Sequence, residues 1–313
     1  MPNSRKPNPS RNPRTPPSSQ RSTALSSQHS APPELIDPRW ILKALAIVLT
    51  VALLCAWATL CLLWYQGQWQ LVLHPSRTVA TTPASVGLQF TDLHFADDAT
   101  GVPQLHGWLI PAASGATLTP SAPTALLLHG ADGSIANVLP SATTLHNAGL
   151  NVLVFDYRGY GRSVGSHPTE ASMQQDSEAA LSFLISTQHI PASHIIVYGQ
   201  GLGASLAVNL AAQHRDVPAI ILDAPEGDLT NRVAHDAHSW LIPVRLLFHE
   251  NFPLAEPLRT LTTPKLLISY SSSTPPALAQ AANPKLTVEL PSPNDPELIS
   301  TIQRFLSLYV HTP

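Results

Sequence analysis

Hydrophobic and polar residues divide the chain into three stretches of different character. Residues 1–39 hold nine prolines and eight serines and few apolar side chains, which is typical of disorder. Residues 44–65 are apolar and contain no charge. From residue 88 onward, short apolar runs alternate with amphipathic stretches, as in a globular domain. We therefore predict a disordered tail (1–39), a transmembrane anchor (40–66) and a globular domain (67–313).

The charge-free stretch is long enough to cross a bilayer. As a helix, residues 44–65 would be about 33 Å long, against a hydrocarbon core of about 30 Å. Trp40 lies at one end, and Trp64, Tyr65 and Trp69 lie at the other, where interfacial aromatic residues are expected. A buried helix of this length would carry a polar face, and a cleaved signal peptide would have a shorter apolar region followed by small residues. We expect an uncleaved anchor that contacts the lipid bilayer.

Short apolar runs in the globular part predict an α/β sheet. Alternating patterns at 88–95 and 105–110 predict half-buried strands. Strands buried on both faces are predicted by continuous runs at 125–128, 152–155, 195–198, 219–222 and 266–268. Helical spacing lies between these runs, and this alternation predicts a doubly wound, mostly parallel sheet.

Two further segments complete the predicted domain. A closing helix is expected over 298–309, with Asp295 as its cap and Pro296 in its first turn. The stretch 224–260 is longer than a simple crossover and rich in histidine, proline and aromatic residues. We interpret it as a short lid over the strand ends.

Charge is unevenly distributed and excludes some functions. Residues 1–43 carry a formal charge of +5 and the remainder −8, for a net charge of −3. Nothing in this balance favours nucleic acid. The basic flank predicts a cytoplasmic N-terminus and an extracytoplasmic domain, periplasmic if the chain is bacterial. Both cysteines, Cys55 and Cys61, lie within the apolar stretch, which excludes a disulfide framework.

Three loops follow predicted strands, at the edge where open α/β sheets place their sites. Their sequences are His129-Gly130-Ala131-Asp132-Gly133, Asp156-Tyr157-Arg158-Gly159-Tyr160-Gly161-Arg162-Ser163 and Gly199-Gln200-Gly201-Leu202-Gly203. In this order and spacing, and with the preceding Gly107-Trp108-Leu109-Ile110-Pro111, residues 66–313 resemble the α/β-hydrolase superfamily. More narrowly, the chain is similar to its membrane-anchored, serine-aminopeptidase-like group.

The resemblance implies a nucleophile elbow at 199–203, but the nucleophile is absent. The family needs serine at the centre of G-x-S-x-G, and here that residue is Gly201. Glycine suits the turn, since an elbow imposes a backbone conformation that glycine adopts readily. The resemblance also implies an oxyanion hole formed by the backbone N–H groups of Ala131 and Leu202.

The other two triad positions are also unmatched. The family's acid follows the strand matching 264–268, where this chain has Tyr270-Ser271-Ser272-Ser273-Thr274-Pro275 and no carboxylate. The family's histidine follows the last strand, where this chain has Leu290-Pro291-Ser292-Pro293-Asn294-Asp295. No confident catalytic residue remains.

Substitutes for the triad were weighed against structural roles. Ser205, one turn beyond the elbow, is expected to pack within its helix rather than act as a nucleophile. Asp223 ends a predicted strand where some relatives carry their acid, although a turn or cap is the simpler role. The resemblance gives His129 a structural hydrogen-bonding role.

A metal site was considered at His235 and His238, with Asp228, Asp236 and His249 nearby in sequence. Surface histidines on a helix are the commoner explanation. We expect no metal and no cofactor. Asp156, Arg158 and Arg162 are expected to form a buried polar brace.

These features favour a membrane-anchored, non-catalytic α/β-hydrolase relative that binds a small acyl or peptide-like ligand or a protein partner. The alternative is an active esterase or peptidase with a relocated triad. A third possibility is a purely structural envelope protein.

The charge asymmetry generates a prediction of topology. Protease added to intact spheroplasts should digest the globular domain and spare the N-terminal tail, because basic residues flank the anchor on its N-terminal side. Protection of the domain would contradict this orientation.

Overall fold

The computed structural model describes residues 37–97, 100–112, 118, 119, 121–235, 241–270 and 276–310. The first 36 residues, and with them nearly all of the predicted disordered tail, lie outside this set. The chain divides into two compact units, residues 1–54 and 55–313. The helix α1 (Pro38–Gly67) carries the charge-free stretch and is long and apolar enough to cross a membrane.

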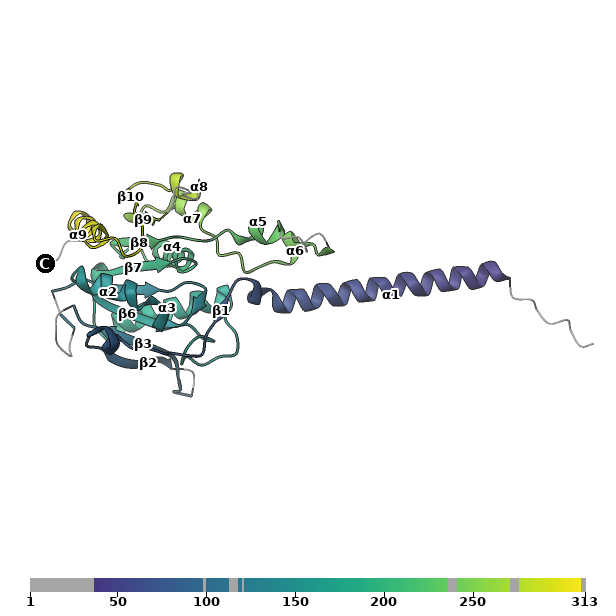
Figure 1. Ribbon diagram of the computed structural model, residues 1–313, viewed down its shortest axis with the longest axis horizontal. Helices are drawn as coiled ribbons and strands as arrows, with labels where there is room; N and C mark the ends of the chain where they lie inside the picture. Colours follow the sequence, from purple (N-terminus) through teal and green to yellow (C-terminus); the bar gives the residue numbers. More distant parts are fainter. Residues whose placement is uncertain are drawn as a thin grey trace, which may run out of the picture. The chain divides into compact units, whose positions relative to one another are not determined.

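Eight strands form the central sheet (Figure 1). Their order is β10 (Lys285–Glu289), β9 (Lys265–Ser269), β8 (Ala219–Asp223), β7 (Ile195–Gln200), β4 (Thr124–Leu128), β6 (Asn151–Asp156), β3 (Pro103–Ile110) and β2 (Thr91–Asp97). The six strands from β10 to β6 pair in parallel. Strand β3 pairs antiparallel with β6 on one side and with β2 on the other. A two-residue strand, β1 (His74–Pro75), pairs with β5 (Asp132–Gly133) away from this sheet. The predicted mostly parallel α/β sheet is confirmed.

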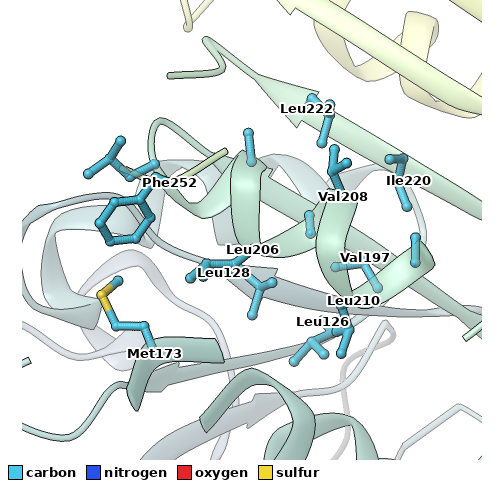
Figure 2. Packing of buried hydrophobic residues seen from close by; sticks show 14 of the residues in the cluster. Leu126, Leu128, Met173, Val197, Leu206, Val208, Leu210, Ile220, Leu222 and Phe252 are labelled. Atoms are coloured by element: carbon cyan, nitrogen blue, oxygen red, sulfur yellow. The ribbon is translucent and has the colours of Figure 1, made fainter. Parts of the chain in front are cut away.

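Alternate side chains of the central strands enter two apolar cores. Leu126 and Leu128 face α3 (Glu170–Ser186) and α4 (Gly203–Gln213), and Figure 2 shows them among side chains of β7, β8 and α4. Ala125 and Leu127 belong to the other core, with α2 (Leu139–Asn147) and α9 (Glu297–Tyr309). Since both faces are covered, these strands read as continuous apolar runs.

The predicted lid is built of short helices. They are α5 (Leu229–Ala234), α6 (Val244–Leu247) and α7 (Ala255–Thr260), while residues 236–240 lie outside the described set. A further short helix, α8 (Pro276–Ala279), precedes β10. Helices α5 and α6 lie at the end of the domain opposite α9 (Figure 1).

Element boundaries differ from the sequence pattern by a few residues, and one strand was not predicted. The first strand begins at Thr91 rather than 88, because a 3-10 turn ends at Gly87, whose φ is +77°. The closing helix begins at Glu297, and Asp295 caps it by accepting a 2.8 Å hydrogen bond from the Glu297 N–H. The edge strand β10 was missed because its residues are only partly buried and form no apolar run.

Two residues of α9, one buried in the core that α9 shares with α2 and one exposed, allow the placement of this helix to be tested. Ile302 on α9 is fully buried, whereas Leu308 on the same helix is 57% exposed. Ile302→Ala should lower the free energy of unfolding by about 2–5 kcal/mol, and Leu308→Ala by no more than about 0.5 kcal/mol. Denaturant unfolding of the full chain in detergent micelles measures both. Equal losses would contradict this placement of α9.

Candidate active site

A sharp turn joins β7 to α4, and Gly201 lies at its centre. The φ of Gly201 is +56°, in the left-handed region that favours glycine. Its N–H donates to the backbone oxygen of Asp223 at the end of β8 (3.0 Å), and its own oxygen accepts from the N–H groups of Ala204 and Glu226 (3.1 and 3.0 Å). The expectation of a glycine-type conformation between strand and helix is confirmed.

The three glycines of this turn have different reasons to be glycine. A Cβ on Gly199 would lie 2.5 Å from the backbone oxygen of Gly203, and a Cβ on Gly203 would lie 2.1 Å from that of Leu128. A Cβ on Gly201 would meet only the Cα of Gly130, at 3.7 Å. The outer glycines are therefore required by close backbone packing. The central position has open space for a side chain, so the loss of the serine is not imposed by packing.

The loop after β4 abuts the turn. A Cβ on Gly130 would lie 3.4 Å from the backbone oxygen of Gln200 and 4.0 Å from the backbone nitrogen of Leu202. Among the residues that the structure describes, the N–H groups of Ala131 and Leu202 donate to no backbone or side-chain acceptor. These are the two amides that the sequence resemblance implies for an oxyanion hole.

Hydrogen bonds to its carbonyl oxygens hold this loop in place. The Ala131 oxygen accepts from the Tyr160 hydroxyl (2.7 Å) and from the His74 N–H (3.0 Å). The Tyr157 hydroxyl donates to the oxygen of His129 (3.2 Å). With its carbonyls directed into these bonds, the loop leaves the Ala131 amide available on the side of the turn.

His129 supports the loop from within the core. Its ring is fully buried, 4.4 Å from the ring centre of Tyr157, and its Nδ1 donates to the Gly130 oxygen (2.8 Å). Burial lowers the pKa of His129, although the Asp156 carboxylate opposes the shift. The side chain is thus a neutral structural group, as the resemblance implies.

Asp223 lies beside the turn but is engaged with tyrosines. The Tyr198 hydroxyl donates to its Oδ2 (2.5 Å), and the side chain is almost fully buried. Burial raises the pKa of Asp223, while the hydrogen bond from Tyr198 and the nearby Tyr270 hydroxyl oppose the shift. The acid of a catalytic triad orients a histidine ring through a hydrogen bond. The Asp223 carboxyl instead accepts its hydrogen bond from a tyrosine hydroxyl.

Ser205 is placed as a packing residue. It is fully buried in the first turn of α4, and its hydroxyl donates to the Pro253 oxygen (2.7 Å). This bond ties α4 to the segment that leads into α7. The acid loop of the family falls largely on residues 271–275, outside the described set, while Asp295 in the other loop is used as the α9 cap.

The predicted brace of Asp156, Arg158 and Arg162 was only partly right. Asp156 is fully buried and its Oδ1 accepts from the Ile135 N–H (2.9 Å). The Arg162 backbone N–H donates to Asp156 Oδ2 (3.4 Å), but the side chains of the two arginines contact other carboxylates. Arg158 binds Asp176 on α3 (Nε–Oδ1 2.6 Å), and Arg162 lies 3.4 Å from Asp92 on β2.

Sequence reasoning missed the histidine that completes this network. His106 on β3 is fully buried between two carboxylates, with Nε2 2.6 Å from Asp92 and Nδ1 3.5 Å from Asp156. The strand pairing sets His106 opposite Asp156, a contact between segments 50 residues apart in sequence. No local pattern points to it.

The described residues of the possible metal site around His235 and His238 give it no support. His238 and Asp236 lie outside the described residues, and His235 bonds to the Asn231 oxygen (2.5 Å). The Asp228 carboxylate accepts from the N–H groups of Leu254 and Ala255. Within the described ranges, no group of three or more potential ligands could hold a metal ion.

A cavity of about 570 Å³ lies away from the lid and includes no residue of the elbow in its lining. It is formed by the start of α2 and the loop before α9, with Leu139, Pro140, Pro293, Asn294 and Ile299 in its wall. The lining is mainly apolar, and Gly201 is not part of it.

The different surroundings of Gly201 and Gly203 lead to a prediction about the stability of the domain. Gly203→Ala should destabilise the domain more than Gly201→Ala, because its Cβ would overlap the oxygen of Leu128, whereas Gly201→Ala carries only left-handed strain of about 1–3 kcal/mol. Thermal unfolding of both variants in detergent tests the ranking. A greater loss at Gly201 would contradict the described packing.

Asp223 generates a prediction about pH. Because its pKa is raised in the folded state, the folded protein binds this proton more tightly, and stability falls as pH rises from about 4 through the folded-state pKa. Asp223→Asn should lack this fall, so its advantage over the wild type should grow with pH. The exposed Asp216→Asn is the control. A constant difference across pH 4–8 would refute the raised pKa.

Comparisons with known proteins identify the family. Residues 120–296 match the family described as serine aminopeptidase, S33. An uncharacterized protein of Mycobacterium tuberculosis is 33% identical over 280 residues, 85% of this chain and 95% of that protein. Protein bem46 of Schizosaccharomyces pombe is 39% identical over 105 residues, 33% of this chain and 35% of that protein.

Solved structures agree on the fold. An esterase of Pyrococcus furiosus aligns with a TM-score of 0.58 at 21% identity, covering 77% of this chain and 99% of the esterase. At this sequence identity, the similarity shows a shared fold and nothing about a shared activity. With the elbow and strand order described above, the chain has the α/β-hydrolase fold and belongs to the serine aminopeptidase (S33) family.

Proposed function

We propose that this protein is a membrane-anchored, non-catalytic α/β hydrolase that binds a ligand or a protein partner at its former active site. The observation that carries the proposal is the turn at Gly201, which keeps the backbone geometry and the space of a nucleophile elbow without a nucleophile.

The missing side chains support inactivity more strongly together than singly. Without a hydroxyl at 201 there is no group to attack a carbonyl, and 290–295 contain no histidine to accept its proton. In serine hydrolases, removal of one triad member leaves only about 10³–10⁴-fold catalysis over water. Here three positions are unmatched in sequence.

The available substitutes are already committed to structural bonds. The Ser205 hydroxyl donates to a backbone oxygen inside the core, and the Asp223 carboxyl accepts from Tyr198. Recruiting either one would break a buried hydrogen bond, at a cost of about 1–3 kcal/mol.

The two amides suggest the chemistry of a ligand. The N–H groups of Ala131 and Leu202 lie beside the empty elbow and resemble an oxyanion hole, which binds a carbonyl oxygen. A small acyl or peptide-like ligand presents such an oxygen. The same pair also supports the second candidate, an active esterase or peptidase with a relocated triad.

The apolar helix supports the anchoring part of the proposal. Large apolar side chains of α1 within the globular unit, such as Leu62 and Leu63, are more than half exposed. Exposure of this kind is costly in water and favourable in lipid. With the basic flank on the N-terminal side, the domain would be extracytoplasmic.

Covalent labelling tests the proposed inactivity. Full-length wild type in detergent should show no labelling by a serine-directed fluorophosphonate, and Gly201→Ser should show little, because neither has a base to activate a hydroxyl. Ser205→Ala is the matched control, since it removes the serine hydroxyl nearest the elbow in sequence. Labelling of the wild type that disappears in Ser205→Ala would establish the relocated triad instead.

A further inference from the structure

The lid carries apolar side chains on its outer surface. Leu246 is 82% exposed and Leu241 is 43% exposed. Val244 and Phe248 of the same segment are buried in the core. The segment 241–249, which we call the outer lid, therefore has one face in the domain and one apolar face outside it.

The outer lid is attached to the C-terminal half of α1. The Trp57 indole N–H donates to the Leu241 oxygen (2.9 Å), and the ring centres of Trp64 and Phe248 lie 6.2 Å apart. The Gln68 side chain, just after α1, accepts from the His249 N–H (2.9 Å). These contacts all lie within the globular unit of residues 55–313.

These contacts place the outer lid beside the apolar part of the helix. Trp57 and Gln68 are separated by about 16 Å along a helix axis, and Trp57 belongs to the charge-free stretch. A hydrocarbon core of about 30 Å that begins at Ala44 would end near Leu63. By the same count Trp57 lies about 9 Å inside that end, so a lid that reaches back to Trp57 passes the bilayer surface and enters the outer part of the hydrocarbon.

The Trp57 hydrogen bond suits this location. A backbone carbonyl in the outer part of the hydrocarbon would cost several kcal/mol if it had no donor. The indole N–H supplies a donor to Leu241 from the helix itself, and tryptophan is enriched at membrane interfaces.

Charge on the outer lid points to phospholipid. Arg245 precedes Leu246, is exposed, and forms no salt bridge with any described residue. Together with Ile242, Pro243 and Val244, these two residues line an open pocket of about 330 Å³. A leucine directed into acyl chains with an adjacent arginine at phosphate level is typical of interfacial segments.

We propose that the outer lid docks on the phospholipid surface around the exit of α1, with Leu241 and Leu246 among the acyl chains and Arg245 at the phosphates. The inference rests on the proposed anchoring role of α1. It adds a second, independent contact with the membrane and couples the lid to the bilayer.

Depth-dependent quenching tests the docking. The full chain is reconstituted in phosphatidylcholine–phosphatidylglycerol vesicles that contain a phospholipid with a nitroxide on its acyl chain. Bimane is attached to single cysteines at three positions. Leu246→Cys reports the outer lid, Leu308→Cys on α9 is an exposed control at the opposite end of the domain, and native Cys61 with Cys55→Ala reports α1.

We expect strong quenching at positions 61 and 246 and none at 308. Quenching at 61 but not at 246 would overturn the docking and leave the anchor intact. No quenching at 61 would overturn the anchoring and the docking with it. Quenching at 308 as well would show non-specific adhesion and overturn the proposed orientation.

Charge reversal isolates the role of the arginine. In the Leu246→Cys protein, Arg245→Glu should reduce the quenching, whereas Arg304→Glu on α9 should leave it unchanged. Melting temperatures equal to that of the parent protein would show that both variants fold. Undiminished quenching with Arg245→Glu would overturn the phosphate contact.

Discussion

The close approach of α4 to the end of β4 is the constraint on which the site depends. Gly199 and Gly203 have no space for a Cβ, because the backbone of the helix and that of β4 already occupy it. This packing turns the chain at Gly201 and leaves the Leu202 amide beside the loop after β4. The framework is set by backbone contacts, so it does not depend on a side chain at position 201.

The same framework accounts for the roles of the surrounding polar residues. The backbone of Asp223 holds the turn, and its carboxyl is enclosed by tyrosines. Tyr160 and His129 hold the neighbouring loop through its carbonyl oxygens. Among the residues that the structure describes, these polar groups thus stabilise the shape of the elbow. Under the function that we propose, such a site would retain the geometry for binding a carbonyl without the chemistry for cleaving it.

Local patterns were sufficient for the buried strands and the elbow, but not for the edge strand β10 or for contacts between distant segments. The buried strands and the glycine spacing at 199–203 are properties of short stretches, and the structure has them where the sequence indicates. The pairing of Arg158 with Asp176 could not be read from the sequence, because several carboxylates were available to it. The contact of Trp57 with Leu241 joins residues 184 positions apart. Periodicity carries no information about such pairs.

Turnover of an activated acyl ester tests the central claim most directly, because it detects any catalytic arrangement, including one that the fold does not reveal. The rate should equal that of vesicles without protein and should be unchanged in Ser205→Ala and Asp223→Asn. Turnover by the wild type that either substitution abolishes would contradict the account and establish an active hydrolase.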